Sequence, residues 1–242
     1  SFYPAMESGY SIPTIMMRFR ELTKRFGVLA LLHMSTLYIG EPEWLQWVSK
    51  VSLLFVLLVW FYDHSKWRAW SKWFGLGQLM CLAGDIILEM EDAFVFGLAA
   101  FLIGQLFYAF SFVRIAREQG AFQAARVFKA VALPLLILVF VVVPRSSSAG
   151  EMMLPVVAYA TVLLTVFTLS LVLVQTDASR LWPLPIGVFV FILSDAILAW
   201  GLFMGDPIPY HEIAIMSSYA LAQFLLTLGA VRALNAQAVQ QA

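Results

Sequence analysis

Long apolar stretches recur along the whole chain, and they constrain its fold more than any other feature. Of the 242 residues, 62% are hydrophobic and 12% are charged, whereas about 25% charged residues is usual for soluble domains. Runs of about 18 or more apolar residues are long enough to cross a bilayer as helices. The sequence therefore predicts an all-α integral membrane protein.

The spacing of these stretches predicts a bundle of eight transmembrane helices joined by short connections. The spans are expected at residues 22–40, 44–62, 71–91, 94–114, 126–144, 151–175, 182–204 and 211–232. Pro134 falls inside a span, where neighbouring helices can satisfy the backbone group that proline leaves unpaired. We interpret residues 22–232 as a single eight-span membrane domain. Residues 1–21 are then an N-terminal segment that can begin with vector-derived sequence, and residues 233–242 are a C-terminal tail.

Basic residues collect on one side of the predicted bundle. With eight spans, all of the 15 Lys and Arg residues except Arg145 and Lys50 fall on the side of both termini. Lys and Arg are enriched in the cytoplasmic loops of membrane proteins. We therefore expect a multi-pass protein with both termini in the cytoplasm.

Two aspartates lie inside apolar spans, where a charged side chain costs about 2.5–3.5 kcal/mol on insertion scales. Asp85 follows Gly84 in the third span, and Asp195 follows Ser194 in the seventh. Each motif is followed by a hairpin into a span that carries both Gln and Tyr, namely Gln105, Tyr108, Tyr219 and Gln223. The similarity suggests a parallel repeat of two four-helix halves.

Five polar side chains from five spans are predicted at one depth in the membrane. Counting about 1.5 Å per residue from the outer span ends places them about 9–14 Å below the surface. They are Lys50, Asp85, Tyr159, Asp195 and Tyr219. Because lipid cannot satisfy polar groups, such groups at one level usually face a shared cavity. A purely structural alternative is that Lys50 forms a buried ion pair with one aspartate, capped by the tyrosines.

Two carboxyl groups in a membrane cavity suit a reaction that passes through an oxocarbenium ion. Burial favours the protonated form of a carboxyl group, and two neighbouring carboxyl groups resist ionising together. One can then act as a general acid while the other, helped by Lys50, stabilises the cation and orients a water molecule. Enol ethers hydrolyse in this way. An amphiphilic vinyl ether that enters from the bilayer would meet both groups just below the headgroup level.

Short motifs around these residues resemble the eight-helix lysoplasmalogenase family of YhhN-like proteins. The resemblance covers about residues 40–232 and includes Gly84-Asp85-x-x-Leu88, Gly104-Gln105-Leu106-Phe107-Tyr108, Ser194-Asp195-x-x-Leu198-Ala199 and Met216-Ser217-Ser218-Tyr219-x-x-Ala222-Gln223. Lys50 and Tyr159 also fall where the family carries Lys and Tyr. The resemblance implies hydrolysis of the vinyl ether of lysoplasmalogens (1-alkenyl-glycerophosphoethanolamine or -choline). The products are a fatty aldehyde and the glycerophospho-alcohol, and no metal or organic cofactor is implied.

The resemblance also implies roles for individual residues and a location. Asp85 and Asp195 are expected to be catalytic. The expected supporting set is Lys50, Tyr108, Tyr159, Tyr219, Gln105, Gln223 and Ser194. Gln105 stands where family members usually have His, so we expect it to donate a hydrogen bond and not a proton. The expected partners are the lipid substrate and the bilayer, without nucleic acid. The family occupies the endoplasmic reticulum membrane in animals and the inner membrane in bacteria.

Two other function classes fit parts of the pattern. Parallel repeats with ionisable groups also describe small proton-coupled transporters, although the polar groups here lie toward one face and not at the midplane. A zinc-dependent membrane hydrolase of the ceramidase–adiponectin-receptor type needs closely spaced histidine ligands. Only His33, His64 and His211 occur, and they lack that spacing, while Cys81 is the single cysteine. No metal site is therefore expected.

Overall fold

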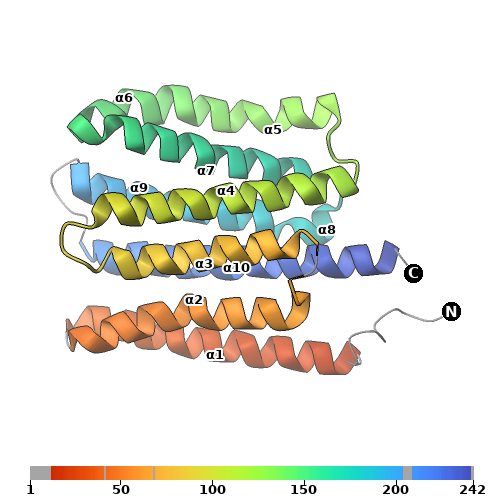
Figure 1. Ribbon diagram of the computed structural model, residues 1–242, viewed down its shortest axis with the longest axis horizontal. Helices are drawn as coiled ribbons and strands as arrows, with labels where there is room; N and C mark the ends of the chain where they lie inside the picture. Colours follow the sequence, from red (N-terminus) through yellow and green to blue (C-terminus); the bar gives the residue numbers. More distant parts are fainter. Residues whose placement is uncertain (1–11, 41, 68, 204–208, 241–242) are drawn as a thin grey trace.

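The computed structural model describes residues 12–40, 42–67, 69–203 and 209–240. Across these ranges the chain forms helices and turns but no strand. The α-helices, labelled in Figure 1, are α1 (Ile12–Ile39), α2 (Glu43–Ser65), α3 (Ser71–Ile87), α4 (Phe94–Glu118), α5 (Ala124–Ile137), α6 (Val143–Ser146), α7 (Met153–Val174), α8 (Ala178–Leu181), α9 (Pro183–Phe203) and α10 (His211–Gln240).

Six stretches of the described chain are long and apolar enough to cross a membrane. They are Glu43–Ser65, Phe94–Glu118, Ala124–Arg145, Ser147–Val174, Ala178–Phe203 and His211–Ala236. The helices α1 and α3 run alongside these six (Figure 1). At 17 residues, α3 is about 26 Å long, close to the thickness of a hydrocarbon core of about 30 Å. The protein is an all-α, multi-pass membrane protein, as the apolar stretches predict.

Helix ends differ from the predicted spans mainly where proline or glycine interrupts the backbone. The predicted span 126–144 consists of α5, a π-helical turn at Leu138–Val142 and α6. Pro134 lies inside α5, where it has no N–H to donate, and the π turn follows one turn later. A 3₁₀ segment at Ser147–Met152 with Gly150 at φ 56° then leads into α7. The first helix begins at Ile12, and α10 continues to Gln240, beyond the predicted ends of the first and last spans.

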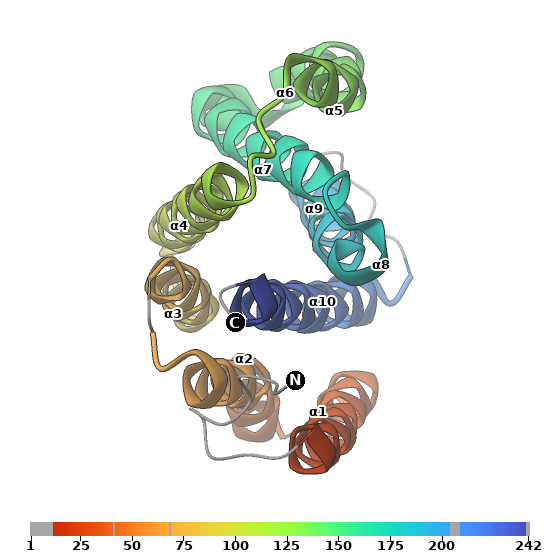
Figure 2. The ribbon, with the colours of Figure 1, turned by 90° about the vertical axis from the view of Figure 1, so that its right-hand side faces the viewer.

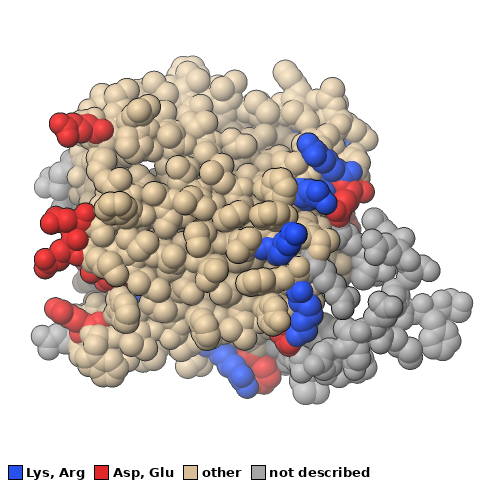
Figure 3. Space-filling model, viewed as in Figure 1, with Lys and Arg blue, Asp and Glu red and all other residues tan. Residues whose placement is uncertain are grey.

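Charged side chains gather at the two ends of the bundle. In Figure 3 almost all visible Lys and Arg side chains lie at the end where α4 leads into α5, and the visible charges at the opposite end are acidic. The band between them is apolar, with large exposed side chains such as Phe128 (80% exposed) and Leu154 (77% exposed). Lipid contact explains this exposure. The start of α1 and the end of α10 both lie at the basic end (Figure 1).

The helix α10 lies near the centre of the bundle (Figure 2), where it packs against α9, α2, α1 and α3. Glycines allow the closest approaches between neighbouring helices. A Cβ atom on Gly77 of α3 would lie 2.6 Å from the Tyr108 ring of α4, and one on Gly187 of α9 would lie 3.0 Å from the backbone nitrogen of Leu226 in α10. These contacts hold α3 against α4 and α9 against α10, the four helices that carry the predicted Asp, Gln and Tyr residues other than Tyr159 of α7.

Candidate active site

Asp85 lies near the end of α3, and its side chain is almost completely buried. The hydroxyl of Tyr219 in α10 donates a hydrogen bond of 2.8 Å to Asp85 Oδ2. Asp85 is 3% exposed and Tyr219 is 6% exposed. The Tyr219 ring lies edge-on to Phe101 of α4 and Phe191 of α9, with centroid distances of 6.0 and 5.5 Å. Side chains from four helices therefore fix this phenol on the carboxylate.

Asp195 in α9 forms the same kind of pair with a different partner. The hydroxyl of Tyr159 in α7 donates a hydrogen bond of 2.7 Å to Asp195 Oδ2. Tyr159 is buried, whereas Asp195 is half-buried. The preceding residue, Ser194, is buried and donates from its hydroxyl to the carbonyl oxygen of Ile215 at 3.0 Å. This bond ties α9 to α10 beside the second carboxylate.

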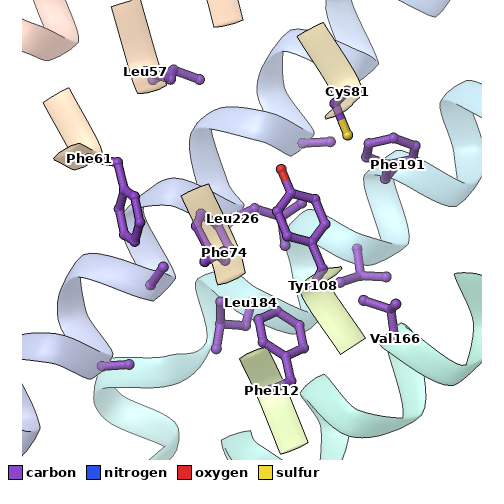
Figure 4. Close-up of a cluster of buried hydrophobic side chains, with 14 of the residues drawn as sticks. Leu57, Phe61, Phe74, Cys81, Tyr108, Phe112, Val166, Leu184, Phe191 and Leu226 are labelled. Carbon is purple, nitrogen blue, oxygen red and sulfur yellow. The ribbon is translucent and has the colours of Figure 1, made fainter. Parts of the chain in front are cut away.

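Cys81 lies within electrostatic range of both Asp–Tyr pairs. Its buried thiol interacts electrostatically with both Asp85 and Asp195, and it also interacts with Tyr108 and Gln223. Figure 4 shows the Tyr108 hydroxyl directed toward the end of the core where Cys81 and Phe191 lie. The two aspartates, which the sequence places only at a common depth, thus lie within electrostatic range of one side chain.

A set of buried hydrogen bonds connects α3, α4 and α10 next to this centre. Tyr108 donates to Gln223 Oε1 at 3.0 Å, and Gln78 donates from Nε2 to Thr227 Oγ1 at 2.8 Å. All four side chains are buried. Gln78 and Thr227 are absent from the predicted site, although helical spacing points to them. Gln78 lies two turns before Asp85, and Thr227 lies one turn after Gln223, so each shares a helix face with a predicted residue.

Gln105 of α4 offers a free hydrogen-bond donor near Cys81. It is 1% exposed, and within the described chain its Nε2 has no hydrogen-bond partner. The preceding residue, Gly104, would place a Cβ atom 3.0 Å from Cys81 Sγ. A buried donor without a partner costs about 1–3 kcal/mol. A bound ligand that supplies an oxygen atom would remove this cost.

Lys50 pairs with Glu89 and not with an aspartate. Its Nζ donates to Glu89 Oε1 at the edge of the site, where the Lys50 side chain is 14% exposed and the Glu89 side chain is 40% exposed. Lys50 also interacts electrostatically with Asp85. The structural alternative of a buried ion pair between Lys50 and an aspartate is therefore wrong. Glu89 lies one helical turn beyond Asp85, nearer the surface, where an ion pair loses less hydration.

Among the described residues, neither a metal-binding cluster nor the cavity at the basic end belongs to this site. The described residues contain no group of three or more His, Cys, Asp and Glu side chains that could hold a metal ion. His33 instead lies between α1 and α2, with its Nδ1 2.8 Å from the Ser49 hydroxyl. A cavity of about 300 Å³ lies at the opposite end of α4, lined by Gln119, Gly120, Gln123, Arg126, Thr176, Asp177, Arg180, Leu181 and Ala236.

Comparisons with known proteins find relatives over most of the chain. The family model described as the YhhN family matches residues 45–230. Lysoplasmalogenase TMEM86B of Mus musculus is 30% identical over 195 residues, which cover 80% of this chain and 79% of the mouse protein. The protein of the same name from Homo sapiens is 33% identical over 162 residues, which cover 64% of this chain and 62% of the human protein. No solved structure matches the chain.

Proposed function

This chain belongs to the YhhN family, and we propose that it hydrolyses the vinyl ether bond of lysoplasmalogens. The products are a fatty aldehyde and glycerophosphoethanolamine or glycerophosphocholine. Relatives named lysoplasmalogenase, which align with most of the chain, support this substrate. The observation that carries the proposal is the presence of two carboxylates, each bound by a tyrosine hydroxyl, within range of the same buried thiol.

The first step is protonation of the β-carbon of the enol ether, and we assign the proton to Asp195. Lys50 interacts with Asp85, whereas the interaction found for Asp195 is its hydrogen bond with Tyr159. Because no cation lies beside Asp195, we assign it the protonated, donating role and leave the ionised role to Asp85. Tyr159 occupies Oδ2 of Asp195, so Oδ1 carries the proton. Protonation converts the ether into an oxocarbenium ion.

Asp85 acts as the carboxylate in the second step. Lys50 favours its ionised form, and Tyr219 holds its Oδ2. The carboxylate stabilises the oxocarbenium ion and accepts a proton from the water that attacks the α-carbon. The resulting hemiacetal then collapses. Its carbon–oxygen bond to glycerol breaks as the glycerol oxygen takes the proton held by Asp85. The hemiacetal hydroxyl returns a proton to Asp195, so both groups regain their starting forms and the aldehyde leaves. One water is consumed, and no electron is transferred.

The distribution of charge supports a proposal for the leaflet in which this chemistry takes place. We propose that the basic end, where α1 begins and α10 ends, faces the cytoplasm, because Lys and Arg are enriched on that side of membrane proteins. The Asp–Tyr pairs then lie toward the opposite leaflet, in the endoplasmic reticulum of a eukaryote or the inner membrane of a bacterium. A parallel repeat of two four-helix halves stays a prediction.

The decisive experiment compares three lysolipids that differ only at the sn-1 linkage. Purified protein in detergent should release fatty aldehyde from the 1-alkenyl lipid and should leave the 1-alkyl and 1-acyl lipids intact. In D₂O the aldehyde should carry deuterium on the carbon next to its carbonyl, because that carbon is the one protonated. Absence of aldehyde from the alkenyl lipid would contradict the proposal. Fatty acid release from the acyl lipid would indicate an esterase instead.

A further inference from the structure

The ion pair between Lys50 and Glu89 has a position that the hydrolytic steps do not explain. Glu89 follows the last turn of α3, and its backbone N–H donates to the carbonyl oxygen of Ile86 at 3.3 Å. The next residue, Met90, donates to Ile87 at 3.0 Å. The turn therefore holds Glu89 at the end of the helix that carries Asp85. Lys50 reaches it from α2.

The distance from Asp85 to this pair matches the glycerol part of a lysolipid. Glu89 lies four residues after Asp85, which is about 6 Å along a helix axis. In a lysoplasmalogen, five bonds of about 1.5 Å separate the vinyl ether oxygen from the phosphorus, so the extended link spans about 6 Å. A substrate with its vinyl ether at Asp85 can therefore place its phosphate at the level of Lys50 and Glu89.

The charges of the pair complement a zwitterionic headgroup. Phosphoethanolamine and phosphocholine each carry a negative phosphate next to a positive ammonium group. The pair offers the opposite charges, a positive Lys50 ammonium next to a negative Glu89 carboxylate. The Glu89 side chain is 40% exposed and that of Lys50 is 14% exposed. Glu89 is therefore the member that can move aside while Lys50 stays in place. In the free protein the two residues neutralise each other.

His33 supplies a second observation that points to a ligand at this position. It interacts electrostatically with both Lys50 and Glu89. Its side chain is 1% exposed, and no partner for its Nε2 exists in the described part of the chain. The Ser49 hydroxyl donates to the carbonyl oxygen of Gln46, so His33 donates from Nδ1 to Ser49 and its Nε2 is an acceptor. A buried acceptor without a partner carries a cost that the sn-2 hydroxyl of a lysolipid, which is a donor, would remove.

We propose that the Lys50–Glu89 pair is the headgroup site of the protein and selects zwitterionic lysolipids. Lys50 binds the phosphate, and Glu89 binds the ammonium group. This assignment rests on the proposed hydrolysis of vinyl ethers. It adds a source of specificity, because a 1-alkenyl-glycerol 3-phosphate has the same reactive bond and the same phosphate but no ammonium group for Glu89.

Steady-state kinetics with two substrates test the assignment. The readout is the ratio of kcat/KM for 1-alkenyl-glycerophosphoethanolamine to kcat/KM for 1-alkenyl-glycerol 3-phosphate. Glu89→Gln should lower this ratio about tenfold, since it removes one charge-assisted contact that only the first lipid makes. Glu89→Lys should lower the ratio further, and Glu89→Asp should keep it close to that of the unmodified protein. Glu91→Gln, which changes an exposed carboxylate in the same turn, is the matched control.

Inhibition of the unmodified protein gives the same test without any variant. Glycerophosphoethanolamine should inhibit aldehyde release at a lower concentration than glycerol 3-phosphate. Equal inhibition, or equal ratios in the Glu89→Gln and Glu91→Gln variants, would overturn the headgroup site while aldehyde release continued. Failure of the unmodified protein to release aldehyde from either lipid would instead overturn the proposed function, so the two failures are distinguishable.

Discussion

The two Asp–Tyr pairs present the same groups in different surroundings. Asp85 is buried, its tyrosine is clamped by two aromatic rings, and Lys50 lies within electrostatic range. Asp195 is half-buried and accepts a hydrogen bond from Tyr159, and no ion pair is found for it in the described chain. The local motifs, a small residue before Asp and aliphatic residues after it, are nearly the same. In the proposed mechanism, the neighbours in the fold, and not the motif, therefore divide the roles of base and acid.

The two pairs also differ in which half of the chain supplies the tyrosine. Asp85 in α3 takes its hydrogen bond from Tyr219 in α10, which belongs to the other predicted half of the chain. Asp195 in α9 takes its bond from Tyr159 in α7, within its own half. A repeat of two halves would relate Asp85 to Asp195, but the hydrogen bonds to them are not equivalent. A repeated sequence motif thus does not imply a repeated site.

Removing either carboxylate should have the largest effect. We expect Asp85→Asn and Asp195→Asn each to lower kcat for aldehyde release by about 10²- to 10⁴-fold, the usual range for general acid–base groups. An amide keeps the shape of the side chain but neither delivers the proton nor accepts one. Asp177→Asn, outside the site, serves as the control, and the elution volume in detergent checks the fold. Substantial turnover in either Asp→Asn variant would contradict the assignment of one aspartate as the acid and the other as the base.

Removing the hydroxyl group of each tyrosine should lower kcat by a different amount in each Asp–Tyr pair. Tyr219→Phe keeps the ring between Phe101 and Phe191 but leaves a buried carboxylate without its donor. A hydrogen bond to a charged group is worth about 1.5–3 kcal/mol, so kcat should fall about 10- to 100-fold. Tyr159→Phe should cost less, because the proposed role of Asp195 uses its protonated form, which depends less on a donor to Oδ2 than an ionised carboxylate does. Equal losses of kcat in the two variants would contradict the assignment of acid and base.

The small residue before each aspartate should matter for a different reason in each motif. A Cβ atom on Gly84 would lie 2.8 Å from the Phe101 ring, so Gly84→Ala overpacks the site and should cost about 1–3 kcal/mol of stability. Ser194→Ala loses the hydrogen bond to Ile215, which is worth about 1 kcal/mol.

Melting temperatures in detergent measure both changes. Gly27→Ala is the control for the glycine substitution, because a Cβ atom there meets nothing within 4 Å. A larger loss of melting temperature in Ser194→Ala than in Gly84→Ala would reverse the expected order.

Chelation should have the smallest effect. Neither carboxylate needs a metal ion in the proposed reaction, so EDTA or 1,10-phenanthroline should leave the rate of aldehyde release unchanged. The rate is measured before and after dialysis against the chelator. A loss of activity that zinc restores would remove both aspartates from the role of direct acid and base.

Much of the fold could be predicted from the sequence, because crossing a bilayer imposes strong local requirements. Apolar length predicts the helices, and the cost of a carboxylate in lipid singles out Asp85 and Asp195. Counting residues from the helix ends also places Lys50, Tyr159 and Tyr219 at their level. Breaks within spans were harder to predict, as the π turn after Pro134 illustrates. Hydropathy reports the length of an apolar stretch but not the hydrogen-bond pattern inside it.

The contacts between helices could not be predicted in the same way. The sequence placed the tyrosines and the aspartates at one level, but it did not indicate which tyrosine would bind which aspartate, or that Lys50 would reach Glu89. The buried bond between Gln78 and Thr227 was also missed, because the two residues lie 149 positions apart.

The sequence by itself therefore determined the membrane-spanning class, the approximate positions of the helices, and the height of each polar residue along its helix. Only the tertiary structure decided which of those residues meet, and so which carboxylate lies beside a cation and which does not. The physical reason is that helical rise converts sequence position into depth. The identity of the facing side chain depends on the rotation and packing of separate helices.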